Sequence, residues 1–466
     1  YTLSLHDALP IYGCRTSCVC TFLQSRRISG DGQAIVIGSV PRIAFIDLTF
    51  NWPPAGGCWI DTLNVMSGLQ AQGIDVRLFV PDFQAYYPRG KIAADLPVPL
   101  TLVPFNRLTF NFATVKRRFG ALIREYQPDL VFLADGYAMK AHLMDLLGPE
   151  RTILRFYSYE ILCTNLHYYR YHENRVCDRG FLADPDECRR CWFRRIPAWV
   201  RALQIMGHWP ERHPTLHFSQ EVIASRAFTH AYWRRLRENL GRLACAVVYN
   251  RFIASLLKPY AKNVRVIGGG VDIERFQPGD SYSIADGSGE CPVKTFLPGR
   301  ANDPLKGLEV LRQAVSRLRS KGLNVEVHYT AAMDMPGYEP WAINHHWIAY
   351  ENLPDLYRQM DIVAVPSSWI EPFGLTAVEG MASGLPVVAG RIGGLAESVV
   401  DGETGFHFTP DRPDEMALQL EKLVCSPQLR AEMGQKGRVR VEKHYSWHNI
   451  VQHSYLPWIW DLLEKR

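Results

Sequence analysis

Short apolar runs recur along this chain, and glycine-containing turns and amphipathic stretches separate them. The first unit has a strand-like run at residues 42–47, a glycine turn at 53–57, helical periodicity over 60–72 and a second run at 76–80. Similar runs follow at residues 130–133, 152–156, 246–249 and 264–267. Short apolar runs that alternate with helices are typical of parallel strands buried on both faces. We therefore expect a doubly wound α/β sheet in the first half of the chain.

The same pattern returns in the second half of the chain. Apolar runs at residues 361–366 and 384–389 each end in a loop, a glycine-rich turn occupies residues 390–394, and Asp401 begins a tight turn into another short strand. Between the two runs, residues 375–382 have helical spacing, which predicts a helix that begins just after Gly374. Open α/β sheets bind ligands at the carboxyl ends of their strands, so the loop after residue 366 is the expected site.

Two carboxylates flank the start of that helix. Glu371 precedes the Pro-Phe-Gly turn, and Glu379 lies within the helix with seven residues between the two. A helix N-terminus offers unpaired N–H groups and a partial positive charge to a diphosphate. One carboxylate is then placed for sugar hydroxyls and the other for a ribose. The alternative is that each is an ordinary charge beside a helix or on its solvated face.

Two cations occur at a matching position upstream. The segment Phe-Leu-Pro-Gly-Arg ends at Arg300, and Lys306 follows in a Lys-Gly pair before a predicted helix. A departing nucleoside diphosphate accumulates negative charge, which two cations and a helix N-terminus stabilise. Taken singly, Arg300 and Lys306 fit ordinary surface charges better than a binding site, and their spacing between a strand and a helix is what favours a function.

Together these segments resemble the donor site of family 4 glycosyltransferases. The resemblance rests on Glu371 to Glu379, the Gly393-Gly394 turn, the Asp-Gly-x-Thr-Gly-Phe segment that begins at Asp401, and the element with Arg300 and Lys306. It implies a GT-B fold, with two Rossmann-like doubly wound parallel-sheet domains facing across a cleft. It also implies retaining transfer of a hexose-type sugar from a nucleotide-sugar such as a UDP-, GDP- or ADP-sugar.

The resemblance also implies roles for particular residues. Glu371, Arg300 and Lys306 are the expected catalytic residues, and the nucleotide base is expected near residues 345–350. The expected donor-binding residues are Gly56, Gly57, Arg300, Lys306, Glu371, Phe373, Gly374, Leu375, Thr376 and Glu379. No Asp-x-Asp triad accompanies them, so a catalytic divalent ion is not expected.

The acceptor half departs from the family pattern. The family commonly places a His after the fourth or fifth strand of the first domain, where this chain has Ala134, Asp135 and Tyr157. Asp135, Tyr157 and Glu160 are candidate replacements, and the acceptor is a glycan, a lipid-linked or a small molecule. Two alternatives stay open: a sugar epimerase or phosphorylase on the same fold, and a non-catalytic binding protein.

The glycines at 268–270 suggest where two domains join, because three consecutive glycines support no regular element and can form a hinge. We predict an N-terminal acceptor-side domain at residues 34–268, a nucleotide-sugar-binding domain at 269–445, and a C-terminal helix at 446–466 that crosses back to the first domain. Residues 1–11 read as a translated sequencing-library adapter, and residues 12–33 lack clear periodicity. An eroded signal peptide is the alternative for this start.

Length and charge are compatible with these domains. A chain of 466 residues with 47% hydrophobic content can build two cores. No apolar run reaches the roughly 18 residues of a membrane span. The net charge of +5 gives no reason to expect nucleic acid as a partner, and a cytoplasmic location is expected. The basic, aromatic segment 189–201 could rest on the inner face of an anionic membrane, or form a solvated face.

Four of the 11 cysteines lie in an insert at about residues 160–195. They are Cys163, Cys177, Cys188 and Cys191, and the last two form a Cys-x-x-Cys pair. Four thiols can close a tetrahedral structural zinc site, with His167 or His172 as substitute ligands. Free thiols and disulfides are the alternatives. A subset of the family has a similar cysteine insert, which helps to locate the segment and not to identify a ligand.

Overall fold

The structure is a computed structural model. It describes residues 26–28, 34–36, 40–54, 56–83, 91–106, 109–195, 227–279, 284–334 and 339–465. The chain divides into two compact units, residues 1–40 and 41–466. In the first unit, β1 (Arg26–Ile28) pairs antiparallel with β2 (Ala34–Val36). β1 therefore lies in a stretch without a predicted element, and the proposed adapter at residues 1–11 lies outside the described residues.

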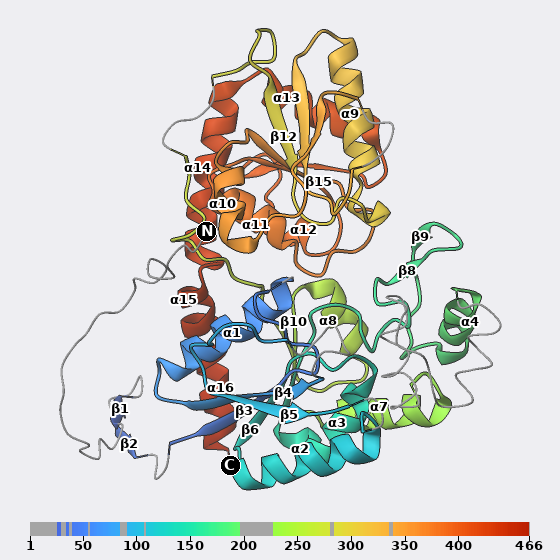
Figure 1. The fold of residues 1–466 in the computed structure, drawn as a ribbon, viewed down its shortest axis with the longest axis vertical. Coiled ribbons are helices and arrows are strands. Elements are labelled where there is room, and N and C mark those ends of the chain that lie inside the picture. Colours follow the sequence, from blue (N-terminus) through green and yellow to red (C-terminus); the bar gives the residue numbers. More distant parts are fainter. Residues whose placement is uncertain are drawn as a thin grey trace, which may run out of the picture. The chain divides into compact units, whose positions relative to one another are not determined.

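The second unit begins with a seven-stranded parallel sheet (Figure 1). Its strands are β3 (Arg42–Ile46), β4 (Asp75–Asp82), β5 (Leu100–Pro104), β6 (Leu130–Leu133), β7 (Thr152–Arg155), β10 (Cys245–Val248) and β11 (Val264–Val266). Their order is β11-β10-β7-β6-β3-β4-β5, and each neighbouring pair is parallel. The central strands β6, β7 and β10 are buried at every residue, as expected for apolar runs covered on both faces.

Helices connect these strands. They are α1 (Gly57–Gln70), α2 (Phe112–Tyr126), α3 (Lys140–Leu147), α7 (His230–Arg242) and α8 (Arg251–Leu257). Side chains cap three of them: Asn111 accepts from the Thr114 N–H, Thr229 from Tyr232 and Asn250 from Ile253. Helix α1 has no side-chain cap, which leaves its first N–H groups for another partner.

A six-stranded parallel sheet forms the second half of this unit. Its strands are β12 (Val293–Leu297), β13 (Val325–Tyr329), β14 (Ala342–Asn344), β15 (Ile362–Val365), β16 (Val387–Gly390) and β17 (Gly405–Phe408), in the order β14-β13-β12-β15-β16-β17. Its helices are α9 (Leu308–Ser320), α10 (Leu353–Tyr357), α11 (Leu375–Ala382), α12 (Leu395–Ser398), α13 (Pro413–Val424) and α14 (Pro427–His444).

Strand order reverses between β12 and β15, where the chain turns from one side of the second sheet to the other. Such a switch point leaves an opening at the carboxyl ends of the two strands, where open α/β sheets bind ligands. Arg300 follows β12 and Glu371 follows β15. The predicted α/β architecture with two parallel sheets is confirmed, and α11 has the predicted bounds.

The triple glycine lies between the last strand of the first sheet, which ends at Val266, and β12. A Cβ at Gly269 would lie 2.8 Å from the Phe373 ring, and one at Gly270 would lie 2.5 Å from Trp447. Close packing therefore requires glycine at positions 269 and 270. The sequence interpretation of this segment as a hinge did not include this reason.

The C-terminal segment packs on the first sheet's domain. It contains α15 (Trp447–Asn449), a π-helix (Ile450–Tyr455) and α16 (Leu456–Glu464), which follow α14 down the same side of the molecule in Figure 1. α15 and the π-helix contact α1, and the Tyr455 ring lies 6.3 Å from Phe132. The aromatic residues here serve packing, because Trp458 and Trp460 are buried.

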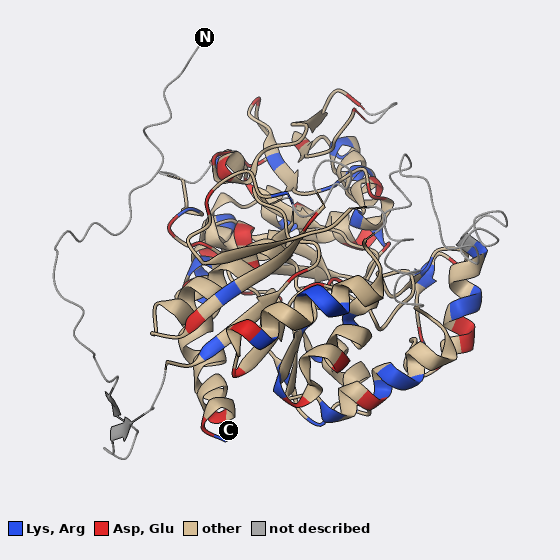
Figure 2. Ribbon diagram, turned by 60° about the horizontal axis from the view of Figure 1, so that its bottom comes forward, with Lys and Arg blue, Asp and Glu red and all other residues tan. Residues whose placement is uncertain are grey.

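The cysteine insert follows β7, and its two described strands pair with each other and not with either large sheet. It contains the hairpin β8 (Tyr169–Arg170) and β9 (Arg175–Val176) and the helix α4 (Pro185–Arg195). The basic, aromatic segment is thus helical up to Arg195, and its remainder lies outside the described residues. Figure 2 shows basic and acidic residues interspersed over the ribbon. In the described part of the chain, no helix is both long and apolar enough to cross a bilayer.

Candidate nucleotide-sugar site

Glu371 is buried and held by three donors at the carboxyl end of β15. Its Oε1 atom accepts from Lys306 Nζ at 2.7 Å, Ser367 Oγ at 2.7 Å and Trp369 Nε1 at 3.0 Å. Burial by itself would raise the pKa of Glu371, but the charge of Lys306 and these hydrogen bonds outweigh it and lower the pKa. Glu371 is therefore an oriented, ionised carboxylate.

Lys306 reaches Glu371 because a glycine follows it. The short 3-10 turn Pro304–Lys306 ends at Gly307, whose φ is +78°. A Cβ at Gly307 would lie 2.0 Å from the Pro366 carbonyl oxygen. No residue with a side chain fits there without moving the backbone, so the Lys-Gly pair lets the turn after β12 lie against the end of β15.

Arg300 lies on the same edge of the sheet but does not join this pair. Its side chain is exposed and, within the described ranges, makes no ion pair with Glu371, whose cationic partner is Lys306. The structure thus brings Glu371 and Lys306 together and leaves the Arg300 guanidinium open to solvent at the carboxyl end of β12.

The N-terminus of α11 meets the N-terminus of α1. Gly57 is the first residue of α1 and Leu375 the first of α11. A Cβ at Gly57 would lie 2.9 Å from the Leu375 side chain. Neither helix has a side-chain cap or an acidic residue in its first turn. Two partial positive charges and the first N–H groups of two helices therefore converge at this contact.

Gly374 and the Gly393-Gly394 turn shape the backbone here. Gly374, which precedes α11, has φ +86°. The Gly394 N–H donates to the Glu371 carbonyl at 2.7 Å, and a Cβ at Gly394 would lie 2.5 Å from the Phe373 carbonyl oxygen. The Gly394 N–H therefore supports the loop that carries Glu371.

Phe373 anchors the loop by packing. Its ring lies 5.4 Å from Tyr249 in a stacked arrangement and 5.7 Å from Tyr445, so the side chain is occupied within the core. The Asn250 amide donates to the Pro372 carbonyl at 2.7 Å. Phe373 was expected among the donor-binding residues, and its ring forms a contact between the two halves of the unit.

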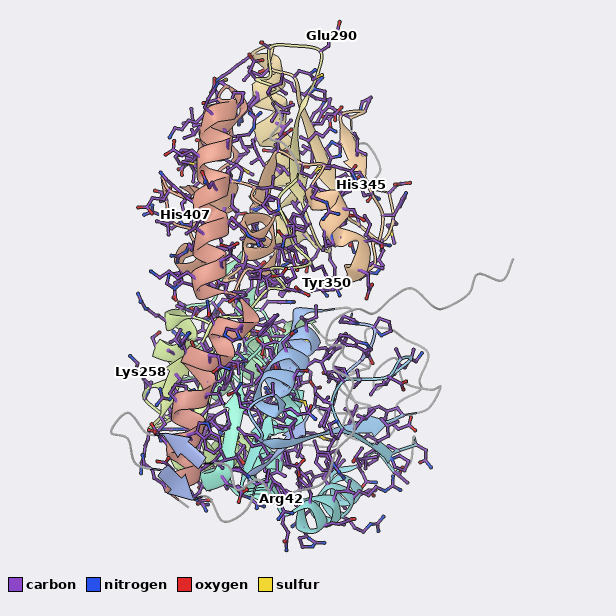
Figure 3. The ribbon with its side chains drawn as sticks, turned by 90° about the vertical axis from the view of Figure 1, so that its left-hand side faces the viewer. Arg42, Lys258, Glu290, His345, Tyr350 and His407 are labelled. Atoms are coloured by element: carbon purple, nitrogen blue, oxygen red, sulfur yellow. The ribbon has the colours of Figure 1, made fainter. Side chains whose placement is uncertain are left out.

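Glu379 is the second of the two carboxylates that the sequence predicts at the donor site. It is 2% exposed and accepts from the Tyr357 hydroxyl at 3.0 Å. Burial raises the pKa of Glu379 to about 8, against a smaller opposing effect of this hydrogen bond. Burial and then the charge of Glu379 raise the pKa of Tyr350, so these two residues are neighbours. Figure 3 shows Tyr350 at the end of the second half nearest the first, below His345.

A second polar cluster lies at the carboxyl ends of β3 and β6. The Thr49 hydroxyl bridges Asp47 at 3.2 Å and Asp135 at 2.9 Å. Burial and then the nearby charge of Asp135 raise the pKa of Asp47 to about 8. Asp135 was a sequence candidate and Asp47 was not, although it ends the first predicted strand.

The other acceptor-side candidates bond within the first half. Tyr157 shares a 2.6 Å hydrogen bond with Thr62 of α1. Glu160 is paired with the buried Lys140 at 3.4 Å and accepts from the Tyr157 N–H. Lys140 gave no signal in the sequence, because a lysine inside a helical pattern is normally exposed.

Comparison with known proteins identifies part of the chain. Residues 342–440 match the glycosyl transferases group 1 family model. This group 1 region contains Glu371, Glu379 and the Gly393-Gly394 turn, whereas Arg300 and Lys306 precede it.

Curated glycosyltransferases resemble part of the chain. Over 208 residues the chain is 34% identical to a D-inositol 3-phosphate glycosyltransferase of Rhodococcus erythropolis, covering 40% of this chain and 46% of that protein. It is 32% identical over 201 residues to an MMP alpha-(1->4)-mannosyltransferase of Mycolicibacterium hassiacum, covering 41% of this chain and 46% of that protein. The chain thus spans about half the length of the curated relatives it matches.

Solved structures show the same fold over most of the chain. A sucrose-phosphate synthase from Thermosynechococcus elongatus superposes with a TM-score of 0.59 at 18% identity, covering 91% of this chain and 99% of that one. HepE from Anabaena, solved in complex with UDP and glucose, superposes with a TM-score of 0.58 at 17% identity, covering 91% and 100%. These likenesses, together with the group 1 region, confirm the GT-B fold.

Proposed function

We propose that this chain is a glycosyltransferase that takes a hexose-type sugar from a nucleotide-sugar and transfers it with retention of configuration. The convergence of the uncapped N-termini of α1 and α11 carries the proposal, because it gathers donors and positive charge at one place. Arg300 adds an exposed cation at the neighbouring strand end. A diphosphate matches this arrangement better than a singly charged ligand.

Each donor group has a candidate partner. The diphosphate contacts Arg300, Lys306 and the backbone of Gly374, Leu375 and Thr376, while Gly56 and Gly57 allow close approach from α1. The Glu371 carboxylate accepts from sugar hydroxyls with its Oε2 atom, since three donors already occupy Oε1. Glu379 accepts from the ribose, and the base lies near residues 345–350. UDP-, GDP- and ADP-sugars all fit this scheme.

The chemistry requires stabilisation of the leaving group. The bond between the anomeric carbon and the diphosphate oxygen breaks, and the acceptor oxygen bonds to the same face of that carbon. The acceptor's proton passes to the leaving phosphate oxygen. Lys306, Arg300 and the two helix N-termini stabilise the charge that develops on the diphosphate. These groups supply the positive charge, so the proposal assigns no step to a catalytic divalent ion.

The acceptor is assigned to the polar cluster of the first half. Asp135, Tyr157 and Glu160 lie at the carboxyl ends of β6 and β7, the edge that faces α11 through Gly57. They stand where the resembling family commonly has a His. A glycan, a lipid-linked or a small-molecule acceptor is compatible with this surface. We place the enzyme in the cytoplasm, with peripheral contact at the inner membrane face as an added possibility.

A screen for transfer and hydrolysis tests the proposal. Purified protein is incubated with UDP-, GDP- and ADP-sugars, with and without an acceptor panel, and released diphosphate is measured. We expect one donor class to react and Glu371→Gln to lower turnover at least a hundredfold with the fold retained. A product formed by isomerisation or phosphorolysis without acceptor would favour the epimerase or phosphorylase. Equal turnover in Glu371→Gln would refute the assigned role.

A further inference from the structure

The four cysteines of the insert lie on segments that contact one another. Cys163 ends a turn after β7, Cys177 follows β9, and Cys188 and Cys191 lie one turn apart on α4. Two residues next to Cys163 contact α4: the Thr164 hydroxyl donates to the Cys188 carbonyl at 3.1 Å, and the Asn165 amide donates to Cys191 Sγ at 3.2 Å.

The hairpin brings the fourth cysteine to the same place. The Cys177 N–H donates to the Tyr168 carbonyl at 2.9 Å. Tyr168, Cys163 and Cys188 belong to one buried cluster, and Cys177 packs against it. Cys163 and Cys188 are each 6% exposed and Cys191 is 9% exposed, so three of the four thiols are buried.

An N–H group points at one of the sulfurs: Cys191 Sγ accepts from the Asn165 side-chain amide at 3.2 Å. A neutral thiol is a weak acceptor. A metal-bound thiolate is a strong one, and outer hydrogen bonds of this kind orient metal ligands.

The loops around the cysteines contain residues with positive φ. Leu166, Tyr168 and Asn174 have positive φ angles of 69°, 53° and 48°, which cost free energy unless the surrounding structure enforces them. The two-residue strands β8 and β9, a Tyr169–Asn174 hydrogen bond and the ion pairs of Arg170 hold these turns. A tetrahedral ion would fix four points of such a loop at once.

We propose that Cys163, Cys177, Cys188 and Cys191 bind one zinc ion as four thiolates. In the described part of the chain no three His, Cys, Asp or Glu side chains already stand at metal-ligand spacing, so the sulfurs must close in on the ion. Four thiolates around Zn²⁺ carry a net charge of minus two. The site is structural, since all four tetrahedral positions are protein ligands.

The insert also supports Glu371. The Tyr159 hydroxyl donates to the Ile370 carbonyl at 3.1 Å, and the His167 ring lies 5.0 Å from Trp369, whose indole N–H donates to Glu371. Zinc would therefore hold the loop that orients this carboxylate. That consequence rests on the proposed function, whereas zinc binding does not.

Metal content tests the proposal directly. The full chain is purified without chelators, and the number of zinc ions per chain is measured by elemental mass spectrometry. Cys188→Ser and Cys163→Ser are compared with Cys425→Ser and Cys291→Ser, which change exposed thiols elsewhere. We expect about one zinc in the wild type and the two controls, and loss of most of it in the two insert variants. Cobalt added to the metal-free chain should give the absorption of a tetrahedral thiolate complex.

Cysteine alkylation provides a second test of zinc binding if an insert variant fails to fold. Wild-type protein is treated with iodoacetamide with and without zinc, and the modified cysteines are mapped by peptide mass spectrometry. Zinc should protect the four insert cysteines and leave the alkylation of Cys291 and Cys425 unchanged. The proposal would be overturned by the absence of both zinc and cobalt absorption, or by iron in place of zinc. A disulfide among the four cysteines, or equal alkylation with and without zinc, would also overturn it.

Discussion

Replacement of Lys306 by Ala should destabilise the second half of the unit far more than loss of an ordinary ion pair. The Lys306–Glu371 pair has an N···O distance of 2.7 Å, with side chains 21% and 8% exposed. Lys321–Glu421 has almost the same distance, 2.6 Å, but side chains 52% and 32% exposed. Burial is therefore the main difference between the two pairs.

The expected magnitudes follow from that difference. Removal of one partner of a buried pair leaves an uncompensated charge and costs about 3–5 kcal/mol, and the lower end applies because Lys306 is partly exposed. Loss of an exposed pair costs less than about 1 kcal/mol. At about 2–4 °C per kcal/mol for a domain of this size, Lys306→Ala should lower the Tm by about 6–12 °C and Lys321→Ala by under about 4 °C.

The pH dependence provides an independent check. In the wild type the pKa of Glu371 is lowered, so its stabilising contribution is present above its ordinary pKa of 4.5 and is lost as pH falls through the lowered value. In Lys306→Ala burial dominates and the pKa of Glu371 is raised, so the variant regains stability as pH falls. Thermal unfolding between pH 8 and pH 4 should show the gap narrowing at the acid end. A gap that stays constant, or equal effects of the two variants, would refute the reasoning.

Two further predictions concern Glu379 and Gly307. Because the pKa of Glu379 is about 8 in the free chain, donor hydroxyls that bind its ionised form should release a proton. Calorimetry in buffers of different ionisation enthalpy should show this release at pH 7, and Glu379→Gln should abolish it. Gly307→Ala should cost more than about 3 kcal/mol, because a Cβ there meets the Pro366 carbonyl as well as a positive φ. Gly322→Ala, which has a positive φ and open space, should cost only about 1 kcal/mol in chemical denaturation; similar losses in both would contradict this account.

The sequence predicted the elements that local pattern controls. The strand at Leu130–Leu133 and the helix at Leu375–Ala382 have the predicted bounds, because uninterrupted apolar runs and a glycine start mark them. β5, over Leu100–Pro104, gave no prediction, since it is an edge strand with mixed exposure. Local pattern is weakest at such strands, where neighbouring elements decide the structure.

The site was predictable only as separate pieces. Glu371, Lys306 and Gly57 each gave a local signal, but nothing in the chain's pattern showed that Gly57 meets Leu375. That contact joins elements more than 300 residues apart. Buried polar residues such as Lys140 and Asp47 were missed for a related reason: their partners come from other elements, and composition alone assigns such side chains to the surface.

Donor binding to an Arg300 variant tests the central claim most directly. Arg300 is exposed, so Arg300→Ala should leave the fold intact, and its guanidinium is assigned to the diphosphate. Calorimetric titration with UDP-, GDP- and ADP-sugars should find one class that binds the wild type, with binding weakened about tenfold or more in the variant, the value of a charge-assisted hydrogen bond. If no nucleotide-sugar binds the wild type, or if Arg300→Ala binds it equally well, the diphosphate site between α1 and α11 is contradicted.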